Sequence, residues 1–509
     1  MNKNFYITTP IYYVNDKPHI GHAYTTIACD ILSRYNKLQK KNVYFLTGTD
    51  EHGQKVEKAS LNSNSKTKDF VDKMSKSFMD LVPALGCEIN DFIRTTEERH
   101  IKESQYLWKK LEDNNQIYLS NYEGWYSIRD EAFYSENELI KKDDNFFAPS
   151  GSPVEWVKEE SYFFKLSEWQ DKLLLFYKNN PKSIQPKARY NEVISFIKSG
   201  LKDLSISRTT FKWGVPVPNN EKHVMYVWID ALCNYLTSIG YPDTTSDKFK
   251  SYWPAMHIVC KDILRFHSVD WPAFLMAADL DPPNRVFAHG WWTNEGEKIS
   301  KSLNNVINPY DVISEFGLDQ FRFYLFREVP FGNDGDFSKN SMVNRINADL
   351  SNNFGNLIQR ICSFINKNSD SIVKNSFILN NDDKKLLDLS EKKLNQYKNF
   401  LDNQEIDKSI KEIFDLLTET NIYVDRQAPW NLKKTNLERM HVVLSVSIEL
   451  IKRCTFMLYP IIPNSSNKVL KLINLDISSL NYDNIFDLPL NSKKINIPEP
   501  IFPRIQLDD

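Results

Sequence analysis

Residues 8–24, reading TTPIYYVNDKPHIGHAY, constrain the fold of this chain more than any other segment. A short apolar run at residues 5–7 precedes them and predicts a β-strand. Apolar residues then recur at helical spacing over residues 20–35, and prolines, an asparagine and an aspartate separate the two patterns. A strand, a polar turn and a helix form the first unit of a nucleotide-binding α/β sheet, where the helix start favours a bound phosphate.

The predicted helix begins at His19-Ile20-Gly21-His22. His19 and His22 are three residues apart, so two imidazoles on nearly one face can donate hydrogen bonds to phosphate oxygens. Gly21 has no Cβ, so a ligand ring can lie against the backbone. A lone histidine is more often an ordinary surface residue. The four residues at a strand-to-helix turn, however, resemble the signature of class I aminoacyl-tRNA synthetases and related nucleotidylyltransferases.

Composition sets outer limits on the function. The chain has 509 residues, 41% of them hydrophobic and 26% charged, which is typical of a soluble protein of about two to four domains. No apolar run is long enough for a membrane span, and residues 1–10 leave no room for a signal peptide, so we expect a cytoplasmic protein. The six cysteines are scattered without a CxxC pair, which argues against disulfides and a thiolate zinc site. With a net charge of −2, any nucleic-acid site must be a local basic patch.

A second strand is predicted at residues 43–46, because an unbroken apolar run is typical of a parallel strand buried on both faces. It ends in residues 47–53, TGTDEHG, which contain Asp50. Ligands of open α/β sheets bind beyond the carboxyl ends of the strands, so Asp50 is placed to meet a substrate ammonium. From this stretch alone, a helix N-cap is an equally good interpretation.

Two segments resemble the lysine-rich KMSKS signature of the same synthetases. Residues 73–77 spell it literally, but residues 70, 74, 78 and 82 are apolar and predict an amphipathic helix with a solvated lysine face. We therefore assign the signature to residues 298–302, KISKS, which follow a predicted buried strand at residues 285–289.

The KISKS loop carries two ammonium groups and added hydroxyl donors. Lys298 and Lys301 can follow a moving phosphate as point charges, and Ser300 adds a hydroxyl. Gly290 and Gly296 are expected to make the segment supple. The alternative is an ordinary solvated basic loop.

A further helix is predicted from residue 225 onward. Four of its residues are spaced for one face: Trp228, Ala231, Leu232 and Tyr235. They are either plain core or an aromatic-lined pocket for an uncharged, flexible side chain. After the next predicted strand, at residues 256–260, Asp262 can accept from ribose hydroxyls or cap a helix, and His267 lies on that helix.

Residues 115–216 interrupt the α/β pattern with many aromatic and turn residues, and predict a small inserted domain with short strands. Related synthetases often carry a zinc knuckle here with paired cysteines. This chain has Ser127, Asp130 and residues 148–150 (Ala-Pro-Ser) around those positions. Structural zinc needs about four nitrogen or sulfur ligands, so we predict an insert that folds without metal.

The segments TPIYYVN, PHIGHA, FLTGTDEHG, YVWIDAL, KDILRFH and VPFGNDGDFS together resemble the methionyl-tRNA synthetases, over nearly the whole chain. The resemblance implies a methionine side-chain pocket lined by Ile11, Tyr13, Trp228, Ala231, Leu232, Tyr235 and His267, with Asp50 on the ammonium. It implies an ATP site, taken up with Mg²⁺, that includes His19, Gly21, His22, Asp262, Lys298, Ser300 and Lys301. Within that set, His19, His22, Lys298 and Lys301 are the implied catalytic residues. One departure is Cys260, where the family usually has glycine, and a side chain there could crowd the ribose.

The last third of the chain, residues 341–475, predicts a helical bundle. Asn356 and Arg360 share a helix face, and Trp430 follows Gln-Ala-Pro; such groups read unstacked bases, although packing and helix surface explain each one alone. The resemblance implies that the three read the anticodon. Some relatives continue into a dimerising domain that this chain lacks, so we expect a monomer.

The predicted fold is α/β. A Rossmann-type parallel-sheet catalytic domain occupies residues 1–114 and 217–340, with a connective insert at 115–216, an α-helical anticodon-binding domain at 341–475 and an irregular tail at 476–509. The resemblance implies activation of L-methionine with ATP and its transfer to the 3′ end of initiator and elongator tRNA(Met). Alternatives are a class I synthetase for another apolar amino acid, and a non-catalytic tRNA-binding paralogue, which would be expected to have lost His19, His22 or Lys301.

Overall fold

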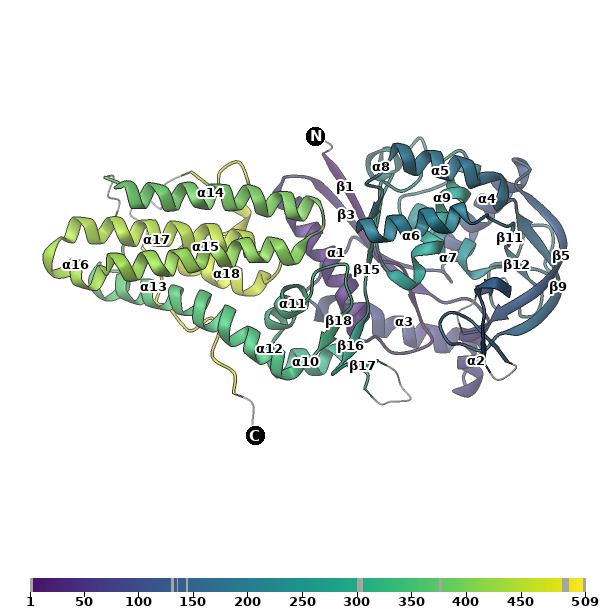
Figure 1. Ribbon diagram of the computed structural model, residues 1–509, viewed down its shortest axis with the longest axis horizontal. Helices are drawn as coiled ribbons and strands as arrows, with labels where there is room; N and C mark the ends of the chain where they lie inside the picture. The colour runs from purple at the N-terminus through teal and green to yellow at the C-terminus, as the bar shows by residue number, and fades with distance from the viewer. Residues whose placement is uncertain are drawn as a thin grey trace. The chain divides into compact units, whose positions relative to one another are not determined.

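The computed structural model describes residues 3–129, 132–134, 136–142, 145–299, 305–374, 378–487 and 494–506, without the side chains of residues 132, 133 and 298. The chain forms two compact units, each built from segments far apart in the sequence (Figure 1). The helical unit comprises Met1–Lys3, His19–Val43 and His289–Asp509. The sheet unit comprises Asn4–Pro18 and Tyr44–Ala288.

A parallel sheet forms the centre of the sheet unit. Its strands lie in the order β10-β15-β14-β1-β3-β2, and β4 also pairs with β3. The bounds are β10 (Ile184–Gln185), β15 (Arg285–His289), β14 (Met256–Cys260), β1 (Asn4–Thr8), β3 (Asn42–Asp50), β2 (Tyr12–Tyr13) and β4 (Asp91–Arg94). Ile7 pairs in parallel with Met256, and Leu46 with Asp91. The predicted α/β class is confirmed, and the carboxyl ends of β1, β3 and β14 meet at one edge.

Helices flank this sheet and bury its apolar side chains. Within the sheet unit α4 packs on α7 and α8 on β1 (Figure 1). The bounds are α2 (Gln54–Asn62), α3 (Thr67–Ala84), α4 (Glu98–Asp113), α7 (Val227–Thr237), α8 (Asp247–Tyr252) and α9 (Trp271–Ala277). In α3, Phe78 is buried while Lys73 and Lys76 are exposed. The literal KMSKS segment is therefore an amphipathic helix, as predicted.

The region predicted as an insert contains an antiparallel sheet in the order β11-β9-β5-β6. The bounds are β5 (Ile117–Ser127), β6 (Ala132–Tyr134), β7 (Ile140–Lys142), β8 (Asn145–Phe147), β9 (Glu155–Phe164) and β11 (Leu204–Ser205). β5 and β9 span 11 and 10 residues, longer than the short strands expected. The same range holds α5 (Gln170–Asn179), β10 and α6 (Lys187–Lys198), and β10 pairs with β15 of the parallel sheet. The boundary at residue 216 stays a prediction.

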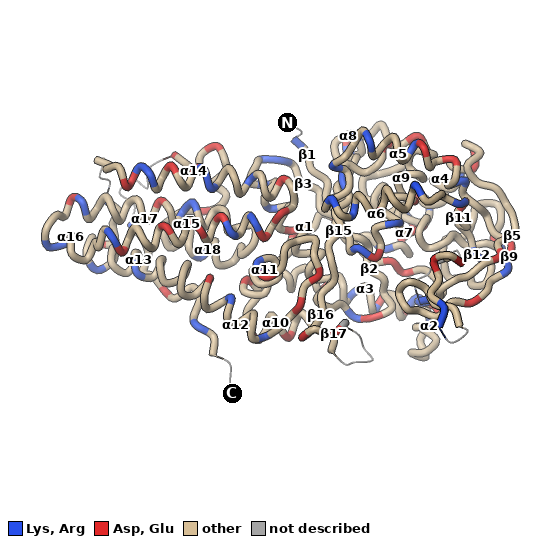
Figure 2. Tube along the Cα trace, in the orientation of Figure 1, with Lys and Arg blue, Asp and Glu red and all other residues tan. Residues whose placement is uncertain are grey.

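The helical unit contains the bundle predicted for the last third of the chain (Figure 1). The helices of the whole unit are α1 (Ile20–Leu38), α10 (Pro309–Phe316), α11 (Leu318–Arg327), α12 (Lys339–Arg345), the π-helix η6 (Ile346–Gly355), α13 (Asn356–Asn368), α14 (Asn381–Asp402), α15 (Ile406–Gln427), α16 (Pro429–Thr435), α17 (Leu437–Leu458) and α18 (Pro463–Leu472). Figure 2 shows both charge signs along α14 and α15, as expected from the small net charge. Among the described residues, none of the helices is long and apolar enough to cross a bilayer.

A buried ion pair joins α1 to the bundle within the helical unit. Arg322 on α11 donates to the Asp30 carboxylate at 2.6 Å and to the carbonyls of Ile461 and Pro460 at 2.8 and 3.0 Å. Arg34 also donates to Asp30 at 2.8 Å. Because the Asp30 and Arg322 side chains are excluded from water, each needs these partners.

A small sheet, β17 (Glu297–Lys298), β16 (Trp292–Asn294) and β18 (Gly335–Phe337), leads toward the KISKS segment. Glu295 and Gly296 have φ of 50° and 81°, which suits the two-residue turn between β16 and β17. A Cβ on Gly290 would lie 2.3 Å from the Asn333 carbonyl oxygen. The role of Gly290 is thus close backbone packing rather than the suppleness that the sequence favoured.

Candidate active site

The start of α1 is capped by its own histidines. The His19 side chain is the N-cap, and its Nδ1 accepts from the Gly21 N–H at 3.1 Å. In return, Nδ1 of His22 accepts from the His19 N–H at 3.0 Å, and the ring centroids lie 3.9 Å apart. The two predicted catalytic histidines are therefore brought together on the first turn, as the spacing indicated.

These contacts fix the hydrogen positions on both rings. Because each Nδ1 accepts, the hydrogen of each neutral imidazole is on Nε2. Burial and the neighbouring His19 hold the pKa of His22 well below its usual range, which favours this neutral form. Two Nε2–H donors at a helix N-terminus suit a phosphate ligand.

Gly21 has a packing role that the sequence did not reveal. A Cβ at this position would lie 2.9 Å from Cε1 of His19. The His19 ring can therefore fold over the helix start only because Gly21 has no side chain. Close ligand approach, predicted from the sequence, stays a prediction.

The KISKS loop is only partly covered by the structure. Lys298 lies in β17, but its side chain is outside the described residues, as are Ser300 and Lys301. Their predicted phosphate roles stay predictions.

The ammonium end of the predicted methionine site lies at the carboxyl end of β3. Asp50 is buried and pairs in register with Tyr13 of β2. The Tyr13 hydroxyl donates to the His52 carbonyl at 3.0 Å, and the Val14 N–H donates to the Asp50 carbonyl at 3.2 Å. Strand pairing thus brings Tyr13 and Asp50 together, although neither neighbours the other in the sequence.

The apolar end is formed by α7 and the segment after β14. Ala231, Leu232 and Tyr235 are buried, Trp228 is partly buried, and the partly buried Ile11 packs on the same core. His267 accepts at Nε2 from the Tyr235 hydroxyl (2.8 Å) because its Nδ1–H donates to the Ile263 carbonyl (2.9 Å).

Burial lowers the pKa of His267 to about 4, so this ring is neutral at physiological pH. A neutral, aromatic lining suits an uncharged side chain such as a thioether.

Phe266 belongs with these residues but was not singled out from the sequence. Its ring stacks on Trp228 with centroids 3.8 Å apart and planes 9° apart. Phe266 starts the π-helix η4 (Phe266–Asp270), which follows the 3₁₀ turn η3 (Lys261–Ile263). The wider turn places Phe266 and His267 on the side of Trp228. In the sequence, the position of Phe266 directly before His267 in KDILRFH was the one indication that it belongs to this site.

Asp262 lies just beyond the carboxyl end of β14 and is exposed, so a ribose could reach it. Cys260 precedes it with φ −79° and ψ 151°, a backbone conformation that any residue adopts. Burial and the Asp262 charge raise the pKa of the Cys260 thiol, which keeps it protonated. The exchange of glycine for cysteine therefore strains no backbone here.

Comparison with known proteins decides the family. The family model "tRNA synthetases class I (M)" matches residues 5–143 and 144–362, and "Anticodon binding domain of methionyl tRNA ligase" matches residues 375–509. This chain belongs to the methionyl-tRNA synthetase family. It is 52% identical over 513 residues to methionine–tRNA ligase of Rickettsia conorii, covering 99% of this chain and 100% of that protein. The corresponding ligase of Brucella suis biovar 1 is 48% identical over 505 residues, covering 99% and 98%.

Solved structures of the methionyl-tRNA synthetase family agree with this fold. Mycobacterium tuberculosis methionyl-tRNA synthetase in complex with methionyl-adenylate matches with a TM-score of 0.96 and 43% identity, over 99% of this chain and 100% of that one. The apo form of that enzyme matches with a TM-score of 0.90 and 40% identity, over 100% and 99%.

The predicted anticodon-binding residues of this family member cluster in the helical unit. Asn356 is exposed at the start of α13, one turn before Arg360. The Arg360 guanidinium lies 5.8 Å from the centroid of Trp430, whose side chain is 43% exposed, and donates to Asp425 at 2.7 Å. Ala428, with φ 46° and ψ 63°, ends α15 and turns the chain so that Trp430 lies on α16. An exposed indole beside a guanidinium can stack on an unpaired base.

Hydrogen bonds and aromatic packing connect the described residues around the positions where relatives carry a zinc knuckle. The Ala148 N–H donates to the Ser152 carbonyl at 2.8 Å, and the hydroxyls of Ser150 and Ser152 lie 2.7 Å apart. Trp125 packs on Phe146 with centroids 4.8 Å apart, and on Trp156 at 5.2 Å. Among the described residues there is no cluster of three or more metal-ligating side chains; Asp130 lies outside them. The prediction of a zinc-free insert stands untested.

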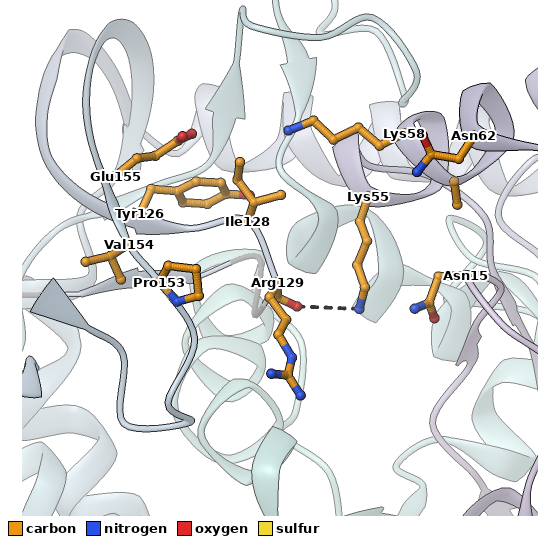
Figure 3. A pocket seen from close by; sticks show the side chains of 11 residues that line it. Asn15, Lys55, Lys58, Asn62, Tyr126, Ile128, Arg129, Pro153, Val154 and Glu155 are labelled. Atoms are coloured by element: carbon orange, nitrogen blue, oxygen red, sulfur yellow. Dashed lines mark hydrogen bonds between the residues drawn. The ribbon is translucent and has the colours of Figure 1, made fainter. Parts of the chain in front are cut away.

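A separate pocket of about 570 Å³ lies in the sheet unit between α2 and the inserted strands (Figure 3). It is lined by Asn15, Lys55, Lys58, Ala59, Asn62, Tyr126, Ile128, Arg129, Pro153, Val154 and Glu155. Lys55 donates to the Arg129 carbonyl at 3.4 Å, and its ammonium lies 5.0 Å from the centroid of Tyr13. The lining of this pocket contains Lys55, Lys58 and Arg129, unlike the neutral lining around Trp228. None of the predicted methionine-binding residues belongs to it.

Proposed function

We propose that this chain is a methionine–tRNA ligase that forms methionyl-adenylate from L-methionine and ATP, and then charges tRNA(Met). The observation that carries the proposal is the neutral aromatic site of Trp228, Tyr235 and His267, in the same unit as the buried Asp50. An acidic group for an ammonium and an apolar lining for a thioether suit one amino acid. The R. conorii relative bears the name of this activity, and the M. tuberculosis structure holds methionyl-adenylate.

Activation requires no protein nucleophile. The methionine carboxylate attacks the α-phosphate of ATP, an O–P bond forms, and the bond to pyrophosphate breaks in line. Asp50 orients the ammonium, and the Nε2–H groups of His19 and His22 donate to the phosphate as charge develops on it. Lys298 and Lys301 neutralise the departing pyrophosphate, and Asp262 holds the ribose. ATP enters as its Mg²⁺ complex, so magnesium is part of the substrate.

Transfer then moves the aminoacyl group from the adenylate to the terminal ribose of tRNA(Met), and AMP leaves. Asn356, Arg360 and Trp430 recognise the anticodon. We further propose that the chain works as a monomer in the cytoplasm and carries no structural zinc.

The test is ATP–pyrophosphate exchange by the purified chain with each standard amino acid, without tRNA. Exchange with methionine alone is expected, and charging of tRNA(Met) should follow when tRNA is added. Exchange with another amino acid would refute the assigned pocket, and no exchange would favour the non-catalytic paralogue.

A Lys301→Ala variant tests the loop separately. It should lower the exchange rate at least about 100-fold while methionine binding changes less than about twofold, because the lysine acts on the phosphates. Equal losses in both would contradict its role in the transition state.

A further inference from the structure

A buried carboxylate in the sheet unit binds two imidazoles. Asp230 on α7 accepts from Nδ1 of His52 at 2.6 Å and from Nε2 of His100 at 2.7 Å. His52 follows β3, and His100 lies on α4. All three side chains are almost inaccessible to water. Asp230 lies in the segment YVWIDAL that carries the family resemblance, but the site described above gives no role to Asp230 or His100.

The chemistry of the cluster sets which group donates. Burial alone would raise the pKa of Asp230, but the two histidines outweigh burial and lower the pKa to about 2. The carboxylate is therefore ionised at neutral pH and can only accept, so His52 presents Nδ1–H and His100 presents Nε2–H. Each oxygen of Asp230 thus has a defined, charge-assisted donor.

The cluster joins the two ends of the methionine site. His52 lies two residues after Asp50, and its carbonyl accepts from the Tyr13 hydroxyl at 3.0 Å. On α7, Asp230 lies between Trp228 and Ala231 in the sequence. The 2.6 Å contact between Asp230 and His52 therefore ties the segment that carries the ammonium-binding group to the helix that carries the apolar lining.

We infer that Asp230 is a positioning residue for methionine: through His52 it fixes the distance between the Asp50 end and the Trp228 end of the amino-acid site, with His100 bracing the carboxylate from α4. The inference rests on the proposed function, because it assigns the cluster to the methionine site. Such a role affects recognition of the amino acid more than that of ATP.

The first variant is Asp230→Asn, which keeps the shape and replaces one acceptor oxygen by an NH2 group that can only donate. In ATP–pyrophosphate exchange we expect the methionine KM to rise about tenfold while the ATP KM stays within about twofold. The matched control is Asp383→Asn. Asp383 is equally buried and accepts from Tyr423 at 2.6 Å in the helical bundle, so the control loses a similar carboxylate and should keep both KM values.

A pair of variants at His100 covers the case in which Asp230→Asn does not fold. His100→Gln can still donate to Asp230, whereas His100→Leu cannot. Among the described contacts, none joins His100 directly to Tyr13, Asp50 or Trp228. If His100 only stabilised its own surroundings, the two variants would therefore have equal methionine KM values. We expect a KM near that of the wild type for Gln and an increase of about fivefold or more for Leu.

The outcomes separate this inference from the proposed function. If the wild type exchanges with methionine but folded Asp230→Asn changes the methionine and ATP KM values equally or not at all, the positioning role is refuted. The same holds if the two His100 variants have equal methionine KM values. A wild-type chain that neither exchanges with methionine nor binds it by calorimetry would refute both.

Discussion

The Tyr235 hydroxyl lies 2.8 Å from Nε2 of His267, and both side chains are buried. Because the Nδ1–H of His267 is committed to the Ile263 carbonyl, the tyrosine must be the donor. The pair is thus a directed chain from tyrosine to histidine to main chain, which holds two residues of the proposed methionine site in one arrangement.

Tyr235→Phe removes the donor and leaves Nε2 of His267 buried without it. An unsatisfied buried acceptor costs about 1–3 kcal/mol, so we expect the methionine KM to rise about 5- to 150-fold with a smaller effect on ATP. The measurement is exchange kinetics with methionine varied at saturating ATP. Tyr397→Phe is the control, since that hydroxyl donates to the Met457 carbonyl at 2.8 Å inside the bundle. Similar methionine KM values in the two variants would contradict the role of the pair.

His22 caps the start of α1 and is proposed to donate to the phosphate, and two substitutions separate these roles. His22→Asn keeps an acceptor near the position of Nδ1, which caps the His19 N–H, but it has no group at the position of Nε2–H. We expect its exchange rate to fall about 100-fold while its melting temperature changes little. His22→Gln extends an amide donor toward the Nε2 position and should retain more activity. Equal rates for the two variants would show that the cap alone matters.

The pKa of His267 predicts how stability depends on pH. The folded value of about 4 lies below the ordinary 6.5, so between these limits the unfolded chain binds a proton that the folded chain rejects. The free energy of unfolding should therefore fall as the pH drops from 6.5 to 4, by up to about 1.4 kcal/mol per pH unit from this group. His267→Gln has no proton to gain, so its urea-unfolding free energy should fall less steeply. An unchanged slope would contradict the assignment.

Trp430→Ala should raise the KM for tRNA(Met) at least about fivefold, because base stacking on an aromatic ring contributes about 1–3 kcal/mol. ATP–pyrophosphate exchange should stay within about twofold, since this step needs no tRNA. Leu437→Ala is the matched control, because Leu437 is another exposed apolar residue of the bundle. A loss of exchange equal to the loss of charging would refute a role in anticodon recognition.

Elemental analysis of the purified chain should find less than about one-tenth of an equivalent of zinc, because the insert lacks the sulfur ligands of a structural site. Incubation with a strong chelator should leave its melting temperature unchanged. One zinc per chain would overturn the prediction and would direct attention to residues 130–131, 135 and 143–144, outside the described part of the insert.

The pattern of apolar residues within a segment was enough to predict several single helices and strands. The period of apolar residues placed α1 and α3, and the unbroken run at residues 43–46 placed β3. The helical spacing of Trp228, Ala231, Leu232 and Tyr235 predicted that they lie on one helix, α7, whereas their role in a pocket stays a prediction.

Relationships between distant residues were not predictable in this way. The pairing of Tyr13 with Asp50, and the reach of His100 to Asp230 across 130 positions, depend on how strands and helices pack. The π-helix at Phe266–Asp270 was also missed, since its extra residue per turn has no propensity signal in KDILRFH. The role of Gly290 depends on Asn333, which approaches it only in the fold.

The buried Asp30–Arg322 pair determines how well a truncated form of this chain would keep its structure. Arg322 donates to carbonyls at residues 460 and 461, so a chain cut near residue 341 would keep the guanidinium and lose two of its acceptors. Helix α1, which His19 caps, would then contact an Arg322 guanidinium that has lost two of its carbonyl acceptors. Deleting the C-terminal third would thus damage activation and anticodon recognition at once, and point substitutions are the cleaner way to study either step.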